Sequence, residues 1–194
     1  MASPFTGTIG GRYALCGEIA SGGMATVHLA RQIGAAGFAR IVAVKRLHER
    51  YSRDPEFVAM FLDEARIVAR IRHPNVVQTV DVVAEDGELF LVMDYVHGES
   101  LLRLTGMANK TSMPLPVPVI AALLASALHG LHEAHEACGE TGEPLGIVHR
   151  DVSPHNILTT SSSAPTAWAG SSISGWPARV SASRRRTRAS SKGS

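Results

Sequence analysis

Short runs in which apolar and polar positions alternate with a period of two occupy the first half of the chain, and this pattern is typical of β-strands. β-Branched residues are enriched in these runs, as at Ile41, Val42 and Val44, and strands favour such residues. Asp86-Gly87 separates the last two runs and is a common hairpin-turn pair. The pattern predicts five strands, over residues 13–19, 26–31, 40–47, 76–83 and 88–95.

One segment in this half has the period of a helix instead. Asp54-Pro55-Glu56 combines an N-cap residue, a proline at the first helical position and an acid in the first turn. We therefore predict a helix from residue 55 to about residue 72, which stops at His73-Pro74-Asn75. Its apolar stripe consists of Phe57, Met60, Phe61, Ile67, Val68 and Ile71.

Glu64 lies within that stripe, at a position where the periodicity predicts a buried residue. A buried carboxylate needs a cation, and Lys45 is the candidate because strand alternation places it on the same face as Ala43. The alternative is that Lys45 extends its ammonium group to solvent and that Glu64 lies at the edge of the stripe.

Helical periodicity returns after Gly98. A short helix is predicted over residues 101–107 and a longer one over 116–136, whose apolar positions are Ile120, Leu123, Leu124, Ala127, Leu128 and Leu131. Five strands with one inserted helix, followed by helices, indicate an α+β protein with two lobes.

The formal net charge of +2 over the 194 residues combines two different compositions. Residues 1–158 hold 13 Lys and Arg against all 17 Asp and Glu, whereas residues 159–194 hold six Lys and Arg and no acid. The second segment also contains 11 serines, and its only branched aliphatic residues are Ile173 and Val180. It is too poor in apolar residues to form a core, so we predict a disordered, basic tail.

Several classes of protein are excluded at this stage. The longest apolar stretch, residues 117–128, is shorter than the roughly 18 residues of a membrane span. The N-terminus has no basic segment followed by an apolar run, as a secretory signal would. Cys16 and Cys138 are the only cysteines, which favours reduced thiols and a cytoplasmic location.

His149-Arg150-Asp151 followed by Asn156 resembles the catalytic loop of protein kinases. Four earlier segments resemble other kinase motifs, in the family's order and at its spacing. They are the nucleotide-covering hairpin 19–27, the Val-Ala-Val-Lys strand that ends at Lys45, the helix that carries Glu64, and the fifth strand and hinge at 91–96. The chain resembles bacterial, eukaryotic-like serine/threonine protein kinases in particular, because their hairpin often carries a Gly-Gly-Met run.

The resemblance implies a function and a division of the chain. A protein kinase transfers the γ-phosphoryl group of ATP to a protein hydroxyl with the help of Mg²⁺. After an N-terminal extension, 1–11, a partial kinase domain would cover 12–158, with a small lobe at 12–94, a hinge at 95–98 and the start of the large lobe at 99–158. The small lobe would be the five-stranded antiparallel sheet plus one helix.

The resemblance also implies roles for single residues. Lys45 would hold the α- and β-phosphates, Glu64 would hold Lys45, Asp151 would accept the proton of the substrate hydroxyl, and Asn156 would bind Mg²⁺. Nucleotide contacts are implied for Ile19, Ala20, Ser21, Gly22, Gly23, Val27, Ala43, Lys45, Met93, Asp94 and Val96.

The chain departs from the family pattern in three places. Ala20 and Ala25 replace the outer two glycines of the hairpin. Ser153 occupies a position at which most serine/threonine kinases carry lysine, and small or hydroxyl residues there also occur in tyrosine kinases. After Leu158 the sequence has no Asp-Phe-Gly, whose aspartate is the main Mg²⁺ ligand of the family.

These departures leave three hypotheses: an active kinase, a nucleotide-binding protein without catalysis, and a regulatory or non-functional fragment. We expect ATP to stabilise the chain without phosphoryl transfer. A truncation or frameshift near codon 159 would explain the change in composition, since 31 of the last 36 residues are Ser, Thr, Ala, Gly, Pro or Arg. The apolar face of the 116–136 helix would then lack much of its cover, so exposed apolar surface and poor solubility are expected.

Two further clusters favour plain interpretations. The run Arg184-Arg185-Arg186-Thr187-Arg188 could bind nucleic acid or an acidic membrane, but a short basic run is more often solvated, and no specific nucleic-acid partner is predicted. His129, His132 and His135 are three residues apart, a spacing that rotates successive side chains by about 60° around a helix. Such a spacing disfavours a metal site.

Overall fold

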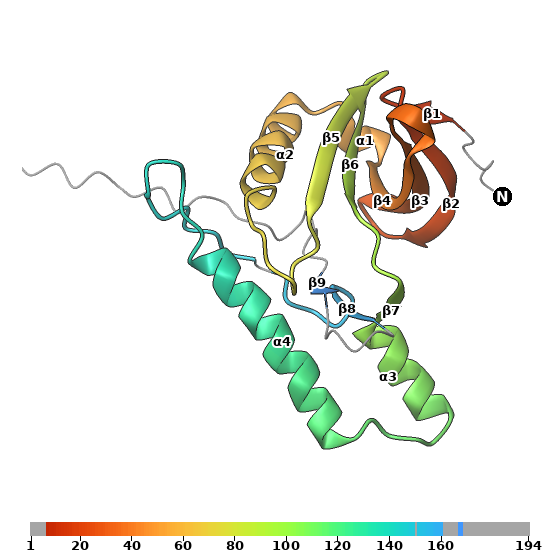
Figure 1. The fold of residues 1–194 in the computed structure, drawn as a ribbon, viewed down its shortest axis with the longest axis vertical. Coiled ribbons are helices and arrows are strands. Elements are labelled where there is room, and N and C mark those ends of the chain that lie inside the picture. Colours follow the sequence, from red (N-terminus) through yellow and green to blue (C-terminus); the bar gives the residue numbers. More distant parts are fainter. Residues whose placement is uncertain (1–6, 150, 161–166, 169–194) are drawn as a thin grey trace, which may run out of the picture.

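A six-stranded antiparallel sheet forms the first lobe of the computed structural model. The structure describes residues 7–149, 151–160 and 167–168, without the side chains of Met60, Glu64, Ala167 and Trp168. The strand order is β1-β2-β3-β4-β6-β5 (Figure 1). The bounds are Thr8–Ile9 for β1, Tyr13–Ser21 for β2, Ala25–Ile33 for β3, Ala39–Leu47 for β4, Thr79–Glu85 for β5 and Glu88–Asp94 for β6.

The five predicted strands are confirmed, and β1 adds a sixth that the sequence did not indicate. Gly10 and Gly11 adopt φ values of +55° and +64°, which suit glycine, and they return the chain so that Ile9 pairs with Tyr13. Ile9 is only 2% exposed and joins the core. The predicted N-terminal extension therefore contributes an edge strand to the sheet.

The hairpin turn predicted at Asp86-Gly87 is present between β5 and β6. Asp86 and Gly87 both have positive φ, +52° and +74°, as a two-residue type I′ hairpin turn requires. The turn aligns Glu85 with Glu88 and sets the register of the two strands.

Helix α2, Pro55–Val68, begins where predicted and ends earlier. The carboxylate of Asp54 accepts the backbone N–H groups of Glu56 and Phe57 at 3.0 and 3.3 Å. At the other end, the N–H groups of Arg70 and Ile71 bond to carbonyls three residues back, which tightens the last turn and ends the helix about four residues before the predicted boundary.

The sheet has an apolar core on each face. On one face, β-strand side chains pack against Phe61 and Ala65 of α2, and this first core comprises Ala25, Ala43, Leu47, Phe61, Ala65, Val77, Leu89, Leu91 and Met93. The opposite face holds a second core of Ile9, Tyr13, Leu15, Ala30, Val42, Val44, Phe90 and Val92. A 3₁₀ turn, Ala35–Gly37, joins β3 to β4, and the short helix α1, Glu49–Ser52, joins β4 to α2.

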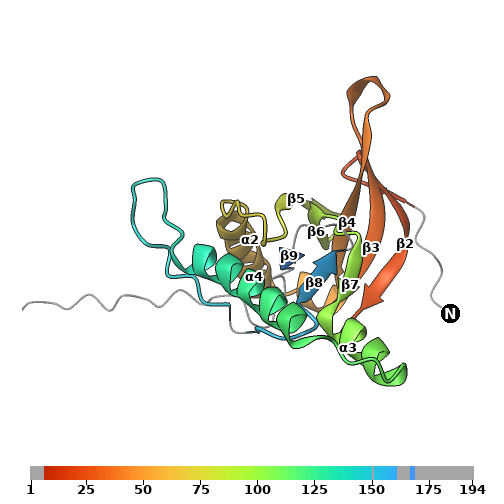
Figure 2. The same ribbon diagram turned by 60° about the horizontal axis from the view of Figure 1, so that its bottom comes forward.

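The second lobe begins at β7, Gly98–Ser100, directly after β6 and the hinge. Helices α3, Leu101–Lys110, and α4, Val117–His135, lie below the sheet, and a small sheet of β7, β8 and β9 lies between the two tiers (Figures 1 and 2). β8 spans Ile157–Thr160 and β9 spans Ala167–Trp168. Both predicted helices are confirmed, and the fold is an α+β arrangement of two lobes.

The apolar stripe of α4 divides into a buried and an exposed part. Ala127 of the stripe is buried, as are Gly130 and Ala134 outside it, whereas Leu124 and Leu128 of the stripe are 45% and 60% exposed. By length and composition, α4 could also cross a membrane, a test that core helices of soluble proteins pass as well. The expected exposure of apolar surface on this helix is confirmed.

The predicted boundary at residue 158 falls inside β8. Thr159 and Thr160 continue the strand, and β9 pairs Trp168 with Ile157. The other residues of the predicted disordered tail, including the run Arg184 to Arg188, lie outside the described residues.

Candidate active site

Strand pairing brings four of the sequence-predicted nucleotide residues onto one face of the sheet. Val27 of β3 pairs with Lys45 of β4, and Ala43 of β4 pairs with Met93 of β6. Paired residues in an antiparallel sheet share a face, and residues two apart along β4 share it as well. Val27, Ala43, Lys45 and Met93 therefore form one continuous surface, which we call the pocket face.

The pocket face has an apolar wall and a polar edge. Ala43 and Met93 are 6% and 7% exposed, so the wall is fixed by packing. Lys45 is half-buried. It lies at the end of the pocket face nearest the β2–β3 turn, because its partner Val27 lies close to that turn. An apolar surface that ends at an ammonium group suits a ligand with a flat apolar part and an anionic part.

Leu158 lies against this face from the other lobe, and the sequence did not single it out. It is a partly buried residue of β8 that packs against the core containing Ala43 and Met93. Because β8 pairs with β7, directly after the hinge, Leu158 is held beneath the sheet. Its signal in the sequence is weak, since a single leucine two residues after Asn156 has no periodic context.

The β2–β3 hairpin covers one end of the pocket face. Ala20 pairs with Val27 and Ser21 with Thr26, and the N–H of Gly22 donates to the carbonyl of Ala25 at 2.9 Å. These contacts close a short turn at the predicted Ser21-Gly22-Gly23 position. Ile19, at a register shift in β2, is 49% exposed.

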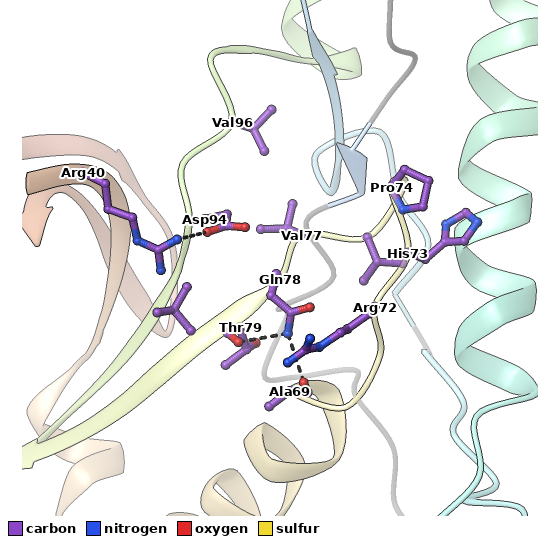
Figure 3. Close-up of a pocket in the computed structure, with 12 residues that line it drawn as sticks. Arg40, Ala69, Arg72, His73, Pro74, Val77, Gln78, Thr79, Asp94 and Val96 are labelled. Carbon is purple, nitrogen blue, oxygen red and sulfur yellow. Dashed lines mark hydrogen bonds and ion pairs between the residues drawn. The ribbon is translucent and has the colours of Figure 1, made fainter.

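Asp94, at the end of β6 before the hinge, has its backbone and its side chain in different environments. Its backbone N–H donates to the carbonyl of Gln78 at 3.0 Å, which leaves its carbonyl as the backbone group for a ligand. Its side chain points away from the pocket face, because Asp94 pairs with Val42 of the second core, and its carboxylate lies 3.3 Å from the Arg40 guanidinium (Figure 3).

Figure 3 shows the groove into which the Asp94 side chain points. It has a volume of about 700 Å³ and is lined from β5, the α2–β5 connection and the hinge. Inside it, the Gln78 amide donates to the carbonyls of Ala69 and Thr79, both at 3.0 Å. Val96 of the hinge also lines this groove.

The catalytic-loop motif folds around the Asn156 side chain. Its amide nitrogen donates to the backbone oxygen of Asp151 and to the carboxylate oxygen Oδ2 of the same residue, both at 3.0 Å. It also lies 3.4 Å from the Ser153 hydroxyl. Asn156 therefore fixes the Asp151 carboxylate, and its own amide oxygen remains the atom suited to a cation.

His149 supports the other end of this loop. It is 2% exposed, and its Nδ1 and its carbonyl oxygen both accept from the Asp151 N–H, at 3.2 and 2.8 Å. Burial lowers the pKa of His149 from its ordinary 6.5 to about 4, although the Asp151 carboxylate acts in the opposite direction. The imidazole is thus neutral at pH 7, which Nδ1 must be to accept a hydrogen bond.

The low pKa of His149 predicts a loss of stability in mild acid. Between about pH 6.5 and pH 4 the unfolded chain binds more protons than the folded chain. The contribution of His149 to the unfolding free energy is therefore fully present above pH 6.5 and is lost as the pH falls toward 4. We expect a loss on the order of 2 kcal/mol, measured by urea unfolding at pH 7.5 and pH 4.5.

His149→Asn is the matched variant for this experiment, since the amide oxygen can accept the same N–H but does not titrate. Its unfolding free energy should depend less on pH in this interval than that of the unchanged chain. His28 is also buried with a lowered pKa and supplies part of the remaining dependence. An equal pH dependence in both proteins would contradict the assignment to His149.

The predicted Lys45–Glu64 pair stays a prediction, because the Glu64 side chain is outside the described residues. Arg150 of the catalytic-loop motif is also outside them. Among the described residues, no three His, Cys, Asp or Glu side chains gather in a way that could hold a metal ion, and this includes His129, His132 and His135.

Comparisons with known proteins agree with this geometry. Residues 13–166 match the protein kinase domain family. The chain is 41% identical over 150 residues to the tyrosine-protein kinase MasK of Myxococcus xanthus, a match that covers 77% of this chain and 23% of MasK. It is 37% identical over 150 residues to the serine/threonine-protein kinase PrkC of Bacillus subtilis, covering 77% and 21%.

A solved structure is similar as well. The kinase domain of Mycobacterium tuberculosis PknI superposes with a TM-score of 0.67 at 29% identity, over 87% of this chain and 61% of that domain. The matches thus span about a fifth to a quarter of the two curated relatives and about three fifths of a solved kinase domain.

Proposed function

The chain belongs to the protein kinase family, and on that premise we propose that it binds ATP on the pocket face. The adenine would lie between Val27 and Ala43 above and Leu158 below, with Met93 at the back. The backbone of Asp94 and Val96 would contact its edge. The observation that carries this proposal is the shared face of Val27, Ala43, Lys45 and Met93, which strand register alone brings together.

The phosphates would extend from the pocket face toward the β2–β3 turn. Lys45 lies at that end of the face and would contact the α- and β-phosphates, and Glu64 would orient the ammonium group. Ile19, Ala20, Ser21, Gly22 and Gly23 would cover them. The methyl groups of Ala20 and Ala25, where the family has glycine, make the approach less close but leave the backbone N–H groups in place.

The catalytic loop suits one Mg²⁺ contact. Mg²⁺ prefers oxygen ligands and keeps several waters or phosphate oxygens, and the Asn156 amide oxygen would supply one protein ligand. When bound, Mg²⁺ neutralises phosphate charge. No Asp or Glu follows Asp151 in the sequence, so the segment after Leu158 contributes no carboxylate ligand.

We propose a protein hydroxyl as the phosphoryl acceptor, with Asp151 as the base. Asp151 is suited to this role because Asn156 holds its Oδ2 atom in place. Most of the curated relatives are named serine/threonine kinases, which favours Ser or Thr. Tyrosine is the second candidate, since MasK is named a tyrosine kinase and Ser153 replaces the usual lysine.

For this chain we propose nucleotide binding without efficient transfer, in the cytoplasm. The missing carboxylate ligand after Leu158 supports the first part. Cys16 and Cys138 support the second, because both are exposed and neither forms a disulfide.

Two assays on the same protein separate the hypotheses. Thermal unfolding is followed with and without ATP and Mg²⁺, and transfer from labelled ATP is measured with a mixed Ser, Thr and Tyr peptide library. Stabilisation without transfer is the expected result. Transfer that disappears in Asp151→Asn would show an active kinase, and neither stabilisation nor transfer would contradict nucleotide binding and favour a regulatory or non-functional fragment.

A further inference from the structure

We propose that Arg50 and His48, which precede α2, are positioning residues that orient the turn of the β2–β3 hairpin for phosphate binding. This inference rests on the proposed ATP site. Neither residue belongs to a kinase motif that the sequence displays. The structure nevertheless connects both to the turn, across more than twenty positions of sequence.

Three contacts join the α1 segment to the hairpin. The backbone N–H of His48 donates to the carbonyl of Met24 at 3.0 Å. The His48 Nε2 atom lies 3.3 Å from the Thr26 hydroxyl, which lies 3.5 Å from that of Ser21. The Arg50 guanidinium donates to the carbonyl of Gly23.

The direction of these bonds determines where the turn's N–H groups point. In a planar trans peptide, the C=O and the following N–H point in opposite directions. Because the Gly23 carbonyl faces Arg50, the Met24 N–H is directed away from α1. Consecutive backbone N–H groups in a tight turn form a good site for phosphate oxygens. Arg50 therefore holds this peptide in one orientation, and we assign its Met24 N–H as a donor to an anionic ligand.

The same contacts link the turn to α2. The Arg50 guanidinium carbon lies 4.7 Å from the centroid of the Tyr51 ring, within cation–π range. The Tyr51 ring lies 5.0 Å from that of Phe57 in the first turn of α2. Phe57 in turn packs against the first core, which contains Ala43 and Met93 of the pocket face. A displacement of α2, the helix that carries Glu64, would thus also move the hairpin turn.

External support of the turn matters in this chain because Gly22 and Gly23, at its tip, are the residues with the greatest backbone freedom. Ala25, at the end of the turn, is 6% exposed and belongs to the core, so it anchors one side. Gly22 and Gly23 are exposed and carry no side chain that could anchor the other side. The Met24 side chain packs against the first core, and the hydrogen bonds from Arg50 and His48 restrain the carbonyls of Gly23 and Met24.

The test compares Arg50→Met with Arg53→Met. Arg53 caps the same short helix and pairs with Glu49, so its loss removes an equal charge without touching the hairpin. Affinities for ATP and for adenosine are measured by calorimetry. Loss of one charge-assisted hydrogen bond predicts about tenfold weaker ATP binding by Arg50→Met, with adenosine binding unchanged. Arg53→Met should bind both ligands as the unchanged chain does.

Hydrogen exchange without nucleotide supplies the readout for positioning. Amides of residues 21–26 should exchange faster in Arg50→Met, and also in Thr26→Val, which loses the hydroxyl contact to His48. Weaker ATP binding with unchanged exchange would make Arg50 a direct phosphate ligand and overturn the inference. Unchanged ATP affinity, or equal losses for ATP and adenosine, would overturn it too. If the unchanged chain binds neither ligand, the proposed function fails and this inference fails with it.

Discussion

Lys45→Met is expected to remove almost all of the stabilisation that ATP gives this chain. Lys45 is half-buried at the polar edge of the pocket face, where an ammonium group meets phosphate with little competing water. At a concentration of 100 times Kd, ATP should stabilise the unchanged chain by about 2.7 kcal/mol. A hundredfold weaker affinity in the variant would leave about 0.4 kcal/mol.

Thermal unfolding measures this difference directly. For a domain of this size, about 2.7 kcal/mol corresponds to a rise in Tm of roughly 5–10 °C. Lys110→Met is the matched control, because it makes the same chemical change on the exposed end of α3. It should retain the full rise. An undiminished rise in Lys45→Met would show that ATP binds away from the pocket face.

Of the single methyl groups added in these variants, the one in Gly98→Ala is expected to lower the unfolding free energy most. A Cβ atom on Gly98 would lie 1.9 Å from the carbonyl oxygen of Thr159 and 2.8 Å from its carbonyl carbon. Both are backbone atoms of β8, so the strand itself must move. β7 would separate from β8, and Leu158 would leave its place beneath the pocket face.

We expect this variant to lose about 3 kcal/mol of unfolding free energy in urea and to bind ATP less tightly. Gly106→Ala is the control, since it also adds one methyl group, in α3, with no atom within 4 Å. Alanine favours helix by up to about 1 kcal/mol relative to glycine, so the control should be unchanged or more stable. Equal stabilities for the two variants would show that β7 and β8 are not in contact.

The sequence predicted the parts of the fold that repeat with a regular period. Alternation along β4 placed Ala43 and Lys45 on one face, and the structure shows them there. The capping aspartate of α2 and the Asp86-Gly87 turn also follow from local chemistry. These features depend on neighbours within four residues, so the sequence displays them directly.

The features that the sequence did not predict depend on contacts between distant segments. β1 has only two residues, too few to show a period, and it forms because Gly10 and Gly11 turn the chain back. Leu158 completes the pocket face from the other lobe through strand pairing. The bond from Arg50 to Gly23 joins residues 27 positions apart, and no local pattern marks it.

A calorimetric titration of ATP with Mg²⁺ into the 194-residue chain tests most directly whether the pocket face is a nucleotide site. We predict saturable binding at one site, competed by adenosine and weakened about a hundredfold in Lys45→Met. An absence of binding up to millimolar ATP by a folded chain, or binding that adenosine does not compete, would contradict the assignment of the pocket face as a nucleotide site.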